Sequence, residues 1–206
     1  TPDYSSAASD VYKRQAELIV AGVDEAGRGP LAGPVFAAAV ILSDDKEILG
    51  LNDSKKLSSK KREILADKIK RNCLAWSISQ CSTEEIDKLN ILNASLLAMK
   101  RSIEDLTLTP DLVLIDGIHA PNLDLNYQTV IKGDESEKSI MAASILAKTA
   151  RDNFMLKVDK RFPEYGFKNH KGYPTKKHLE ALKSYGITVE HRKSFKPVKK
   201  IYESSK

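Results

Sequence analysis

Four acidic side chains are the residues best suited to chemistry, because each follows a short apolar run of the sequence. The runs cover residues 17–23, 112–115 and 127–131. Ligands of open α/β sheets gather at strand ends, where several carboxylates would repel one another without cations. An all-oxygen set of ligands suits Mg²⁺ or Mn²⁺ rather than zinc. The sequence predicts a divalent-metal site formed by Asp24, Glu25, Asp116 and Asp134.

Each acid also has a simpler interpretation, as a turn residue or a helix cap, and Asp134 is a good capping candidate for the helix that follows it. Adjacent residues of a regular strand point to opposite faces. Asp24 and Glu25 can therefore meet the same metal only if the chain bends, which the glycines after them make easy. The glycine-rich stretch 27–33 is no nucleotide loop, because an apolar β-type run follows it instead of a helix.

The elements that must position these acids follow from the periodicity of apolar residues. Strands are predicted at 17–23, 35–42, 73–82, 112–115 and 127–131, the last two as buried strands. A helix is predicted after a cap at Ser58 or Ser59, and one or two helices after the Ser82–Glu85 capping box. A further helix is predicted from Ser139 for five turns, and a short one from its cap at Thr175 to its end at Gly186.

Alternating strands and helices predict an α/β protein with a mixed sheet flanked by helices. We expect a single domain over residues 17–206, with a helical, basic C-terminal extension from about residue 166. Residues 1–16 are small and polar and are predicted to be a frayed leader or one left over from expression.

The charge of the chain is unevenly distributed. The 206 residues carry 33 Lys and Arg against 28 Asp and Glu, a net charge of +5. Residues 55–71 hold eight basic and two acidic side chains, and residues 157–200 hold thirteen and four. Such segregation favours a polyanionic partner around an acidic centre, although solvated helix faces would give the same pattern.

Several classes of protein and site are excluded by composition. No apolar run reaches the ~20 residues of a membrane span, and the N-terminus lacks a signal-peptide pattern, so a cytoplasmic protein is expected. A monomer is expected because the sequence has no long apolar heptad pattern and no evident exposed apolar patch. Cys73 and Cys81 are predicted in one strand, too far apart for a disulfide. The four histidines are scattered in sequence and are given no catalytic role.

Eight words of the sequence carry a resemblance that spans residues 17–200. They are GVDEAGRGPLAGPV (22–35), LNDSKKLS (51–58), ILNASLLAM (91–99), LVLIDG (112–117), VIKGDE (130–135), SIMAASILAKTARD (139–152), HKGYPTKKH (170–178) and HRKSFKPV (191–198). In these words and their order the chain resembles ribonuclease HII, the bacterial type 2 ribonuclease H. Type 3 enzymes look similar but carry a long N-terminal substrate-binding domain and another word in place of Gly27-Arg28-Gly29.

The resemblance implies a ribonuclease H-like fold and hydrolysis of the RNA strand of RNA–DNA hybrids. It also implies incision on the 5′ side of ribonucleotides embedded in duplex DNA, by two metal ions, leaving 3′-hydroxyl and 5′-phosphate ends. The family's four metal ligands fall on the same four acids. Its ribose-recognition residues fall on Gly27, Arg28, Gly29 and Tyr173, the last of which could otherwise be a half-buried core aromatic.

Basic and hydroxyl side chains near these motifs are candidates for phosphate contacts, which position a duplex without reading its sequence. They are Ser54, Lys55, Lys56, Lys148 and Arg151. The basic tail, with Arg192, Lys193, Lys196, Lys199 and Lys200, either adds affinity through counterion release or is a disordered tail that aids solubility.

Two other functions stay open from the residues alone. One is a non-catalytic duplex-binding protein that uses the basic segments and keeps the acids for structure. The other is a nuclease of the same fold that acts on branched or plain DNA.

Overall fold

The computed structural model describes residues 18–204, so the predicted leader, residues 1–16, lies outside the described residues. The strands are β1 (Val20–Ala26), β2 (Val35–Ile41), β3 (Ala75–Cys81), β4 (Leu112–Asp116) and β5 (Tyr127–Val130). The helices are η1 (Ser54–Lys56), α2 (Ser59–Asn72), α3 (Thr83–Leu89), α4 (Ile91–Glu104), α5 (Gly133–Ser136), α6 (Lys138–Arg161), η2 (Pro163–Tyr165), α7 (Phe167–His170), α8 (Lys176–Tyr185) and α9 (Lys196–Ser204).

The five strands form one mixed sheet in the order β3-β2-β1-β4-β5, which confirms the predicted fold class. β1 pairs antiparallel with β2, and β2 with β3, whereas β1, β4 and β5 run parallel. The register sets Val23 of β1 beside Ile115 of β4. Because the two strands run in the same direction, the acids that follow these two residues lie at the same end of the sheet.

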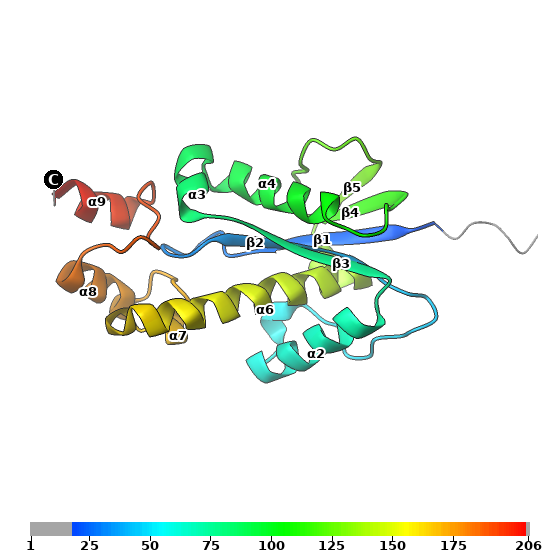
Figure 1. Ribbon diagram of the computed structural model, residues 1–206, viewed down its shortest axis with the longest axis horizontal. Helices are drawn as coiled ribbons and strands as arrows, with labels where there is room; N and C mark the ends of the chain where they lie inside the picture. Colours follow the sequence, from blue (N-terminus) through cyan, green and yellow to red (C-terminus); the bar gives the residue numbers. More distant parts are fainter. Residues whose placement is uncertain (1–17, 205–206) are drawn as a thin grey trace, which may run out of the picture.

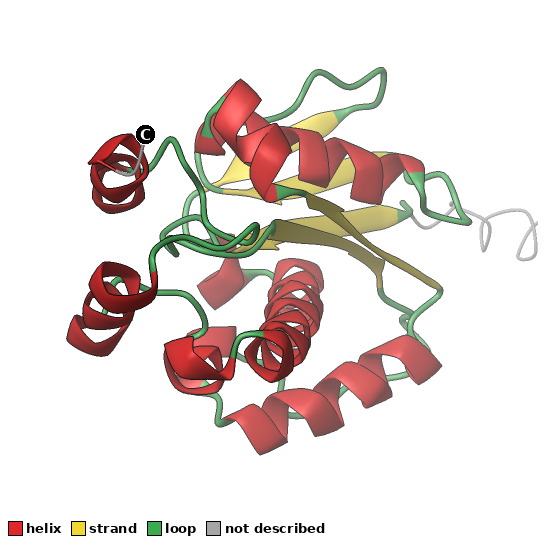
Figure 2. Ribbon diagram, turned by 60° about the vertical axis from the view of Figure 1, so that its left-hand side comes forward, coloured by secondary structure: helices red, strands yellow, loops and turns green. Residues whose placement is uncertain are grey.

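Helices cover both faces of the sheet: α3 and α4 lie on one side, and α6 and α2 on the other (Figures 1 and 2). β2 is buried along its whole length. Its alternate residues Ala37 and Ala39 join the core beneath α4, while Ala38 and Val40 join the core beneath α6. Small side chains let α6 lie close to the sheet, so close that a Cβ on Gly22 would stand 2.2 Å from a backbone atom of Ser139.

The caps predicted at Ser58, Ser82 and Thr175 are confirmed. The cap predicted at Asp134 is wrong, because this residue lies within α5 and the residue before α6 is Glu137. Two predicted strands also differ. Ser82 and Glu85 form a reciprocal capping box. Cys73 lies at the end of α2 rather than in β3, and both cysteines are free. β5 is an edge strand that carries no buried residue, so the prediction of a buried strand is wrong there. Pairing with β4 on one side alone suffices to hold it.

The C-terminal part packs as a third apolar cluster at one end of the sheet (Figure 1). Phe167, Leu182 and Val198, from three different helices, are fully buried there together with Leu31 of the loop after β1. The extension is thus attached to the glycine-rich loop 27–34. No helix among residues 18–204 is long and apolar enough to cross a membrane.

Candidate active site

Three of the four predicted acids converge. Asp24 at the end of β1, Asp116 at the end of β4 and Asp134 in α5 each offer a carboxylate oxygen, and these oxygens lie within 4.8 Å of one another. Backbone amides orient two of them: the N–H of Glu25 donates to Asp24 (2.6 Å), and the N–H of Gly133 donates to Asp116 (2.8 Å). We call Asp24, Asp116 and Asp134 the acidic triad.

Electrostatic repulsion and burial act together on the acidic triad. Asp24 is only 5% exposed, and burial, followed by the charges of Glu25 and Asp116, raises its pKa well above the usual value. Burial and then the charge of Asp134 raise the pKa of Asp116. Buried carboxylates this close are stable in ionised form only with a cation among them. The donor set is all oxygen and fits a hard divalent ion.

Glu25 lies at the edge of this group rather than in it. β1 keeps a regular antiparallel register with β2 through Asp24 and Glu25, yet both residues line the same small cavity. The Glu25 carboxylate accepts a hydrogen bond from the Arg28 guanidinium (3.4 Å). Burial raises the pKa of Glu25, the charge of Arg28 lowers it, and that of Asp116 raises it again. Glu25 is therefore close enough to the triad for the charge of Asp116 to oppose its ionisation.

The 3₁₀ helix η1 brings a cation to the acidic triad. The Lys55 ammonium donates to Asp134 at 3.1 Å, whereas Lys56 pairs with Glu135 at 3.7 Å. Partial burial lowers the pKa of Lys55, but the hydrogen bond and the charge of Asp134 outweigh it and raise that pKa. The two lysines, equivalent in the sequence, are thus distinguished by the structure.

Sequence reasoning missed Ser144 of α6. Its hydroxyl lies 2.8 Å from that of Ser54 and also contributes a hydrogen bond to Asp24. Ser54 is buried and is thereby connected to the acidic triad. Ser144 sits in a run of small residues on the face of α6 that meets the sheet, and only knowledge of β1 as the neighbouring strand could have marked it.

Lys148 lines the small cavity beside the acidic triad, about 220 Å³, together with Glu25, Arg28 and Tyr173. Its ammonium donates to Asp152 at 2.7 Å, and the same carboxylate accepts from Arg62 at 3.1 Å. The predicted phosphate contact of Lys148 therefore competes with an ion pair one helical turn away.

Two buried arginines donate hydrogen bonds to backbone carbonyls of the loop 27–34. Arg192 donates to the carbonyl oxygens of Gly27 (2.6 Å), Arg28 (2.9 Å) and Gly33 (2.9 Å). Arg151 donates to three further carbonyls, those of Ala32 (3.1 Å), Pro34 (3.3 Å) and Lys171 (3.0 Å).

Both guanidinium groups are 0% exposed. Burial, then the charge of Arg151, lowers the pKa of Arg192 to about 9. Neither side chain reaches the surface, so Arg151 is no phosphate contact here and Arg192 is no part of a solvated basic tail. Both instead fix the loop, because a buried charge must find hydrogen-bond acceptors. Lys196, Lys199 and Lys200 lie in helix α9, which contradicts a disordered tail there.

Gly27 and Gly29 differ sharply in their surroundings. Gly27 has φ +101°, and a Cβ there would stand 2.1 Å from Nε of Arg151. A Cβ on Gly29 would meet only the ring of Tyr173, at 3.5 Å. Tyr173 is 42% exposed and lines the small cavity, and it belongs to none of the apolar clusters of the core.

We therefore expect Gly27→Ala to lower the free energy of unfolding by about 2–3 kcal/mol, because it adds backbone strain and displaces a buried guanidinium. Gly29→Ala should change it by less than about 0.5 kcal/mol. Urea unfolding of both variants measures the difference. Equal losses of stability would show that the loop is not held against Arg151.

Three of the histidines that are scattered in the sequence lie together in the structure. His170 and His178 stack with ring centroids 4.6 Å apart, and Nε2 of His178 lies 3.1 Å from Nε2 of His191. The segment between His178 and His191 contains the rest of α8 and the loop after it, and this loop returns the chain so that the two rings meet. No pattern along the chain could have brought these rings together.

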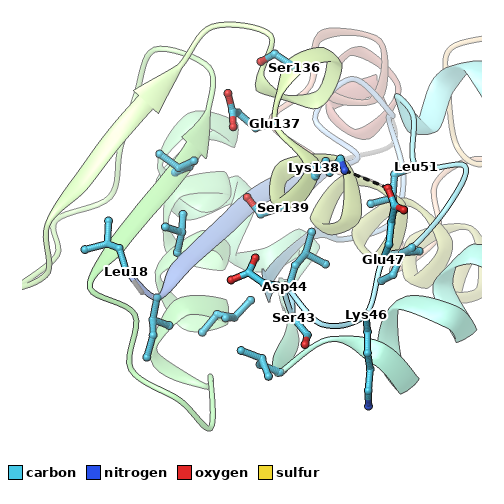
Figure 3. A pocket seen from close by; sticks show the side chains of 17 residues that line it. Leu18, Ser43, Asp44, Lys46, Glu47, Leu51, Ser136, Glu137, Lys138 and Ser139 are labelled. Carbon is cyan, nitrogen blue, oxygen red and sulfur yellow. Dashed lines mark hydrogen bonds and ion pairs between the residues drawn. The ribbon is translucent and has the colours of Figure 1, made fainter. Parts of the chain in front are cut away.

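A larger cavity, about 830 Å³, lies at the opposite end of β1 (Figure 3). Figure 3 shows Lys138 and Glu47 as an ion pair at its edge, with nitrogen and oxygen 3.5 Å apart. The acidic triad takes no part in its lining. Cavity size therefore does not mark the candidate site, whereas the convergence of buried carboxylates does.

Comparisons with known proteins agree on one family. The model of the family described as Ribonuclease HII matches residues 21–198. A protein named Ribonuclease HII from Vibrio campbellii is 56% identical over 186 residues, 90% of this chain and 88% of its own.

Solved structures are similar in fold. The ribonuclease H2 of Pyrococcus horikoshii OT3 has a TM-score of 0.75 at 27% identity and matches 90% of this chain and 97% of its own. A Bst ribonuclease HIII solved in complex with Mn²⁺ has a TM-score of 0.64 at 17% identity, over 94% of this chain and 72% of its own, and shares the fold alone.

Proposed function

The chain belongs to the ribonuclease HII family and is a ribonuclease H that acts on RNA–DNA hybrids, and from this premise we propose that it also cuts duplex DNA on the 5′ side of an embedded ribonucleotide. The products would carry 3′-hydroxyl and 5′-phosphate ends. The single observation that carries the proposal is the acidic triad, with oxygens within 4.8 Å, beside the loop 27–34.

Divalent cations, two Mg²⁺ or two Mn²⁺, would be held by Asp24, Asp116 and Asp134, with Glu25 as the fourth ligand. When bound they would supply activation of the attacking water and neutralisation of the leaving 3′-oxygen. The buried position of Asp24 and the repulsion within the triad support this assignment. A more distant protein of the same fold was solved with Mn²⁺.

The chain's own residues would select and position the substrate. Gly29 leaves open space in front of its backbone, bounded by the Tyr173 ring, into which a ribose with its 2′-hydroxyl can move. Arg28 has a half-exposed side chain and lines the same cavity. Lys55, at 77% side-chain exposure, would leave Asp134 to contact a phosphate once cations neutralise that carboxylate.

The test uses a DNA duplex with one ribonucleotide, an all-DNA duplex and a long hybrid, each with Mg²⁺, Mn²⁺ or EDTA. We expect metal-dependent cutting 5′ of the ribonucleotide, cutting of the hybrid, and none of plain DNA. Asp134→Asn should abolish both activities. Undiminished cutting by this variant would contradict the mechanism, equal cutting of plain DNA would favour a general nuclease, and binding without product in either metal would favour a non-catalytic duplex-binding protein.

A further inference from the structure

Two buried imidazoles connect the C-terminal extension to Tyr173. The ring nitrogens of His178 and His191 lie 3.1 Å apart, and both side chains are almost completely buried, at 0% and 1% exposure. At one end of the pair, Nδ1 of His178 lies 2.9 Å from the carbonyl oxygen of Tyr173. At the other end, Nδ1 of His191 lies 2.9 Å from the backbone nitrogen of Thr188.

The groups at the two ends set the direction of this chain of hydrogen bonds. The N–H of Thr188 can only donate, so Nδ1 of His191 accepts, and a neutral His191 then carries its proton on Nε2. The Thr188 hydroxyl, also 2.9 Å from Nδ1, accepts from the N–H of Glu190 and can donate its own proton to the same ring nitrogen. The Nε2 proton of His191 is donated to Nε2 of His178, whose own proton is on Nδ1 and is donated to the carbonyl of Tyr173. The whole chain therefore runs in one direction and requires both rings to be neutral.

The surroundings of the pair favour neutral rings. The aromatic rings of Tyr165 and Phe167 contact His191 at centroid distances of 5.2 and 5.8 Å, and His170 stacks on His178. Burial, then the facing imidazole, lowers the pKa of His191 to about 3. Burial is also the main reason why the pKa of His178 falls to about 4.

The backbone just before Tyr173, whose carbonyl accepts from His178, has an unusual conformation. Lys171 and Gly172 both have positive φ, +51° and +86°, and a Cβ on Gly172 would stand 2.6 Å from the carbonyl oxygen of Ala32. The carbonyl of Tyr173 also accepts from the N–H of Thr175 at 2.8 Å. Two donors on one carbonyl fix the orientation of the Tyr173 peptide, and with it the direction in which the ring leaves the backbone.

We propose that His178 and His191 are positioning residues, which hold Tyr173 against Gly29 through one directed chain of hydrogen bonds. This inference rests on the proposed function, in which the Tyr173 ring contacts the ribose at the cut site. The histidines touch neither substrate nor metal, and their effect on cutting passes through Tyr173 alone. A displacement of a positioning group by about 1 Å can cost up to about 100-fold in rate.

The first test uses the unaltered full-length chain and no substrate. Nitrogen-15 NMR of the imidazoles at pH 5.5 distinguishes a proton on Nδ1 from one on Nε2. We expect two neutral rings, His178 protonated on Nδ1 and His191 on Nε2. A protonated ring, or either ring in the opposite tautomer, would overturn the proposal, whatever the protein cuts.

The second test compares two amides of similar polarity. In His178→Asn the amide nitrogen takes the place of Nδ1 and can still donate to the Tyr173 carbonyl, whereas in His178→Gln it lies farther out. We expect kcat/KM on the single-ribonucleotide duplex to fall about tenfold for His178→Gln and less than about threefold for His178→Asn. Equal losses would overturn the proposal.

The third test separates positioning from a general loss of structure. In a Tyr173→Ala background, His178→Gln should cause no further loss of cutting, because the side chain that it positions is gone. The same tenfold loss in both backgrounds would overturn the proposal. If Tyr173→Ala by itself cuts as well as the unaltered protein, the proposed function of Tyr173 fails, while the NMR result still decides whether the chain of hydrogen bonds exists.

Discussion

Asp24→Asn is expected to lower cutting of the single-ribonucleotide duplex by about 10³-fold or more while it stabilises the metal-free protein. The amide keeps the size of the carboxylate and its acceptor for the N–H of Glu25. It removes one of three charges within 4.8 Å, and without that charge the remaining carboxylates hold a divalent ion poorly.

The gain in stability follows from the sign of the pKa shift. The pKa of Asp24 is raised in the folded protein, so ionisation of this carboxyl opposes folding as the pH rises through that pKa. At neutral pH, Asp24→Asn removes this unfavourable contribution to the free energy of folding. We expect the melting temperature in EDTA to rise by about 2–4 °C, the shift that ~1 kcal/mol gives in a chain of this size.

Adding Mg²⁺ or Mn²⁺ provides the matching measurement. Each ion should raise the melting temperature of the unaltered protein, because it binds the folded state alone, and should raise that of Asp24→Asn far less. Glu135→Gln serves as a control, since Glu135 is next to Asp134 in the sequence but is half-exposed and pairs with Lys56. Retention of a tenth of the activity by Asp24→Asn would contradict the assignment of the metal site.

The acidic triad could be predicted because its signal is local. Asp24 and Asp116 directly follow apolar residues of β1 and β4, and the parallel pairing of these strands brings the acids together. Asp134 reaches the triad in a different way: β5 ends at Val130, and a left-handed residue at Lys132 turns the chain into α5, which places the acid beside Asp116.

Arg151 and Arg192 show what the sequence could not predict. A count of charges treats both as surface residues that contact phosphate, yet each is 0% exposed and donates only to backbone carbonyls. Arg192 reaches the carbonyl of Gly27, 165 residues away in the sequence. The difference between a solvated and a buried guanidinium depends on which distant backbone offers acceptors, and a single sequence carries no local trace of that.

Acid should destabilise this protein steeply, because His178 and His191 are buried as neutral rings. Their pKa values are about 4 and about 3 in the folded protein, against 6.5 for an ordinary imidazole. Between pH 6 and 5 the unfolded chain therefore binds up to two protons that the folded chain does not. Stability is full above about pH 6.5 and falls as the pH drops, by up to about 2.7 kcal/mol per pH unit.

Urea unfolding in EDTA at pH 6.0, 5.5 and 5.0 measures this slope, and the Asp24→Asn protein is the right background for it. Asp24, Glu25 and Asp116 have raised pKa values and take up protons on the folded side, which works against the histidines. The substitution removes the contribution of Asp24, and the other two carboxyls act equally with and without a change at His178. Adding His178→Asn to that background should reduce the slope by about 1.4 kcal/mol per pH unit, the equivalent of one proton.

His119→Asn serves as the control substitution, because His119 is exposed and lies outside the His178–His191 pair. An equal slope with and without His178→Asn would mean that His178 is protonated in the folded protein. Its Nε2 would then carry a proton that faces the proton on Nε2 of His191, 3.1 Å away, and the hydrogen bond between the two rings would be lost. Acid sensitivity and the positioning of Tyr173 therefore depend on the same protons, and a protein whose slope does not respond to His178→Asn could not hold Tyr173 by the arrangement described.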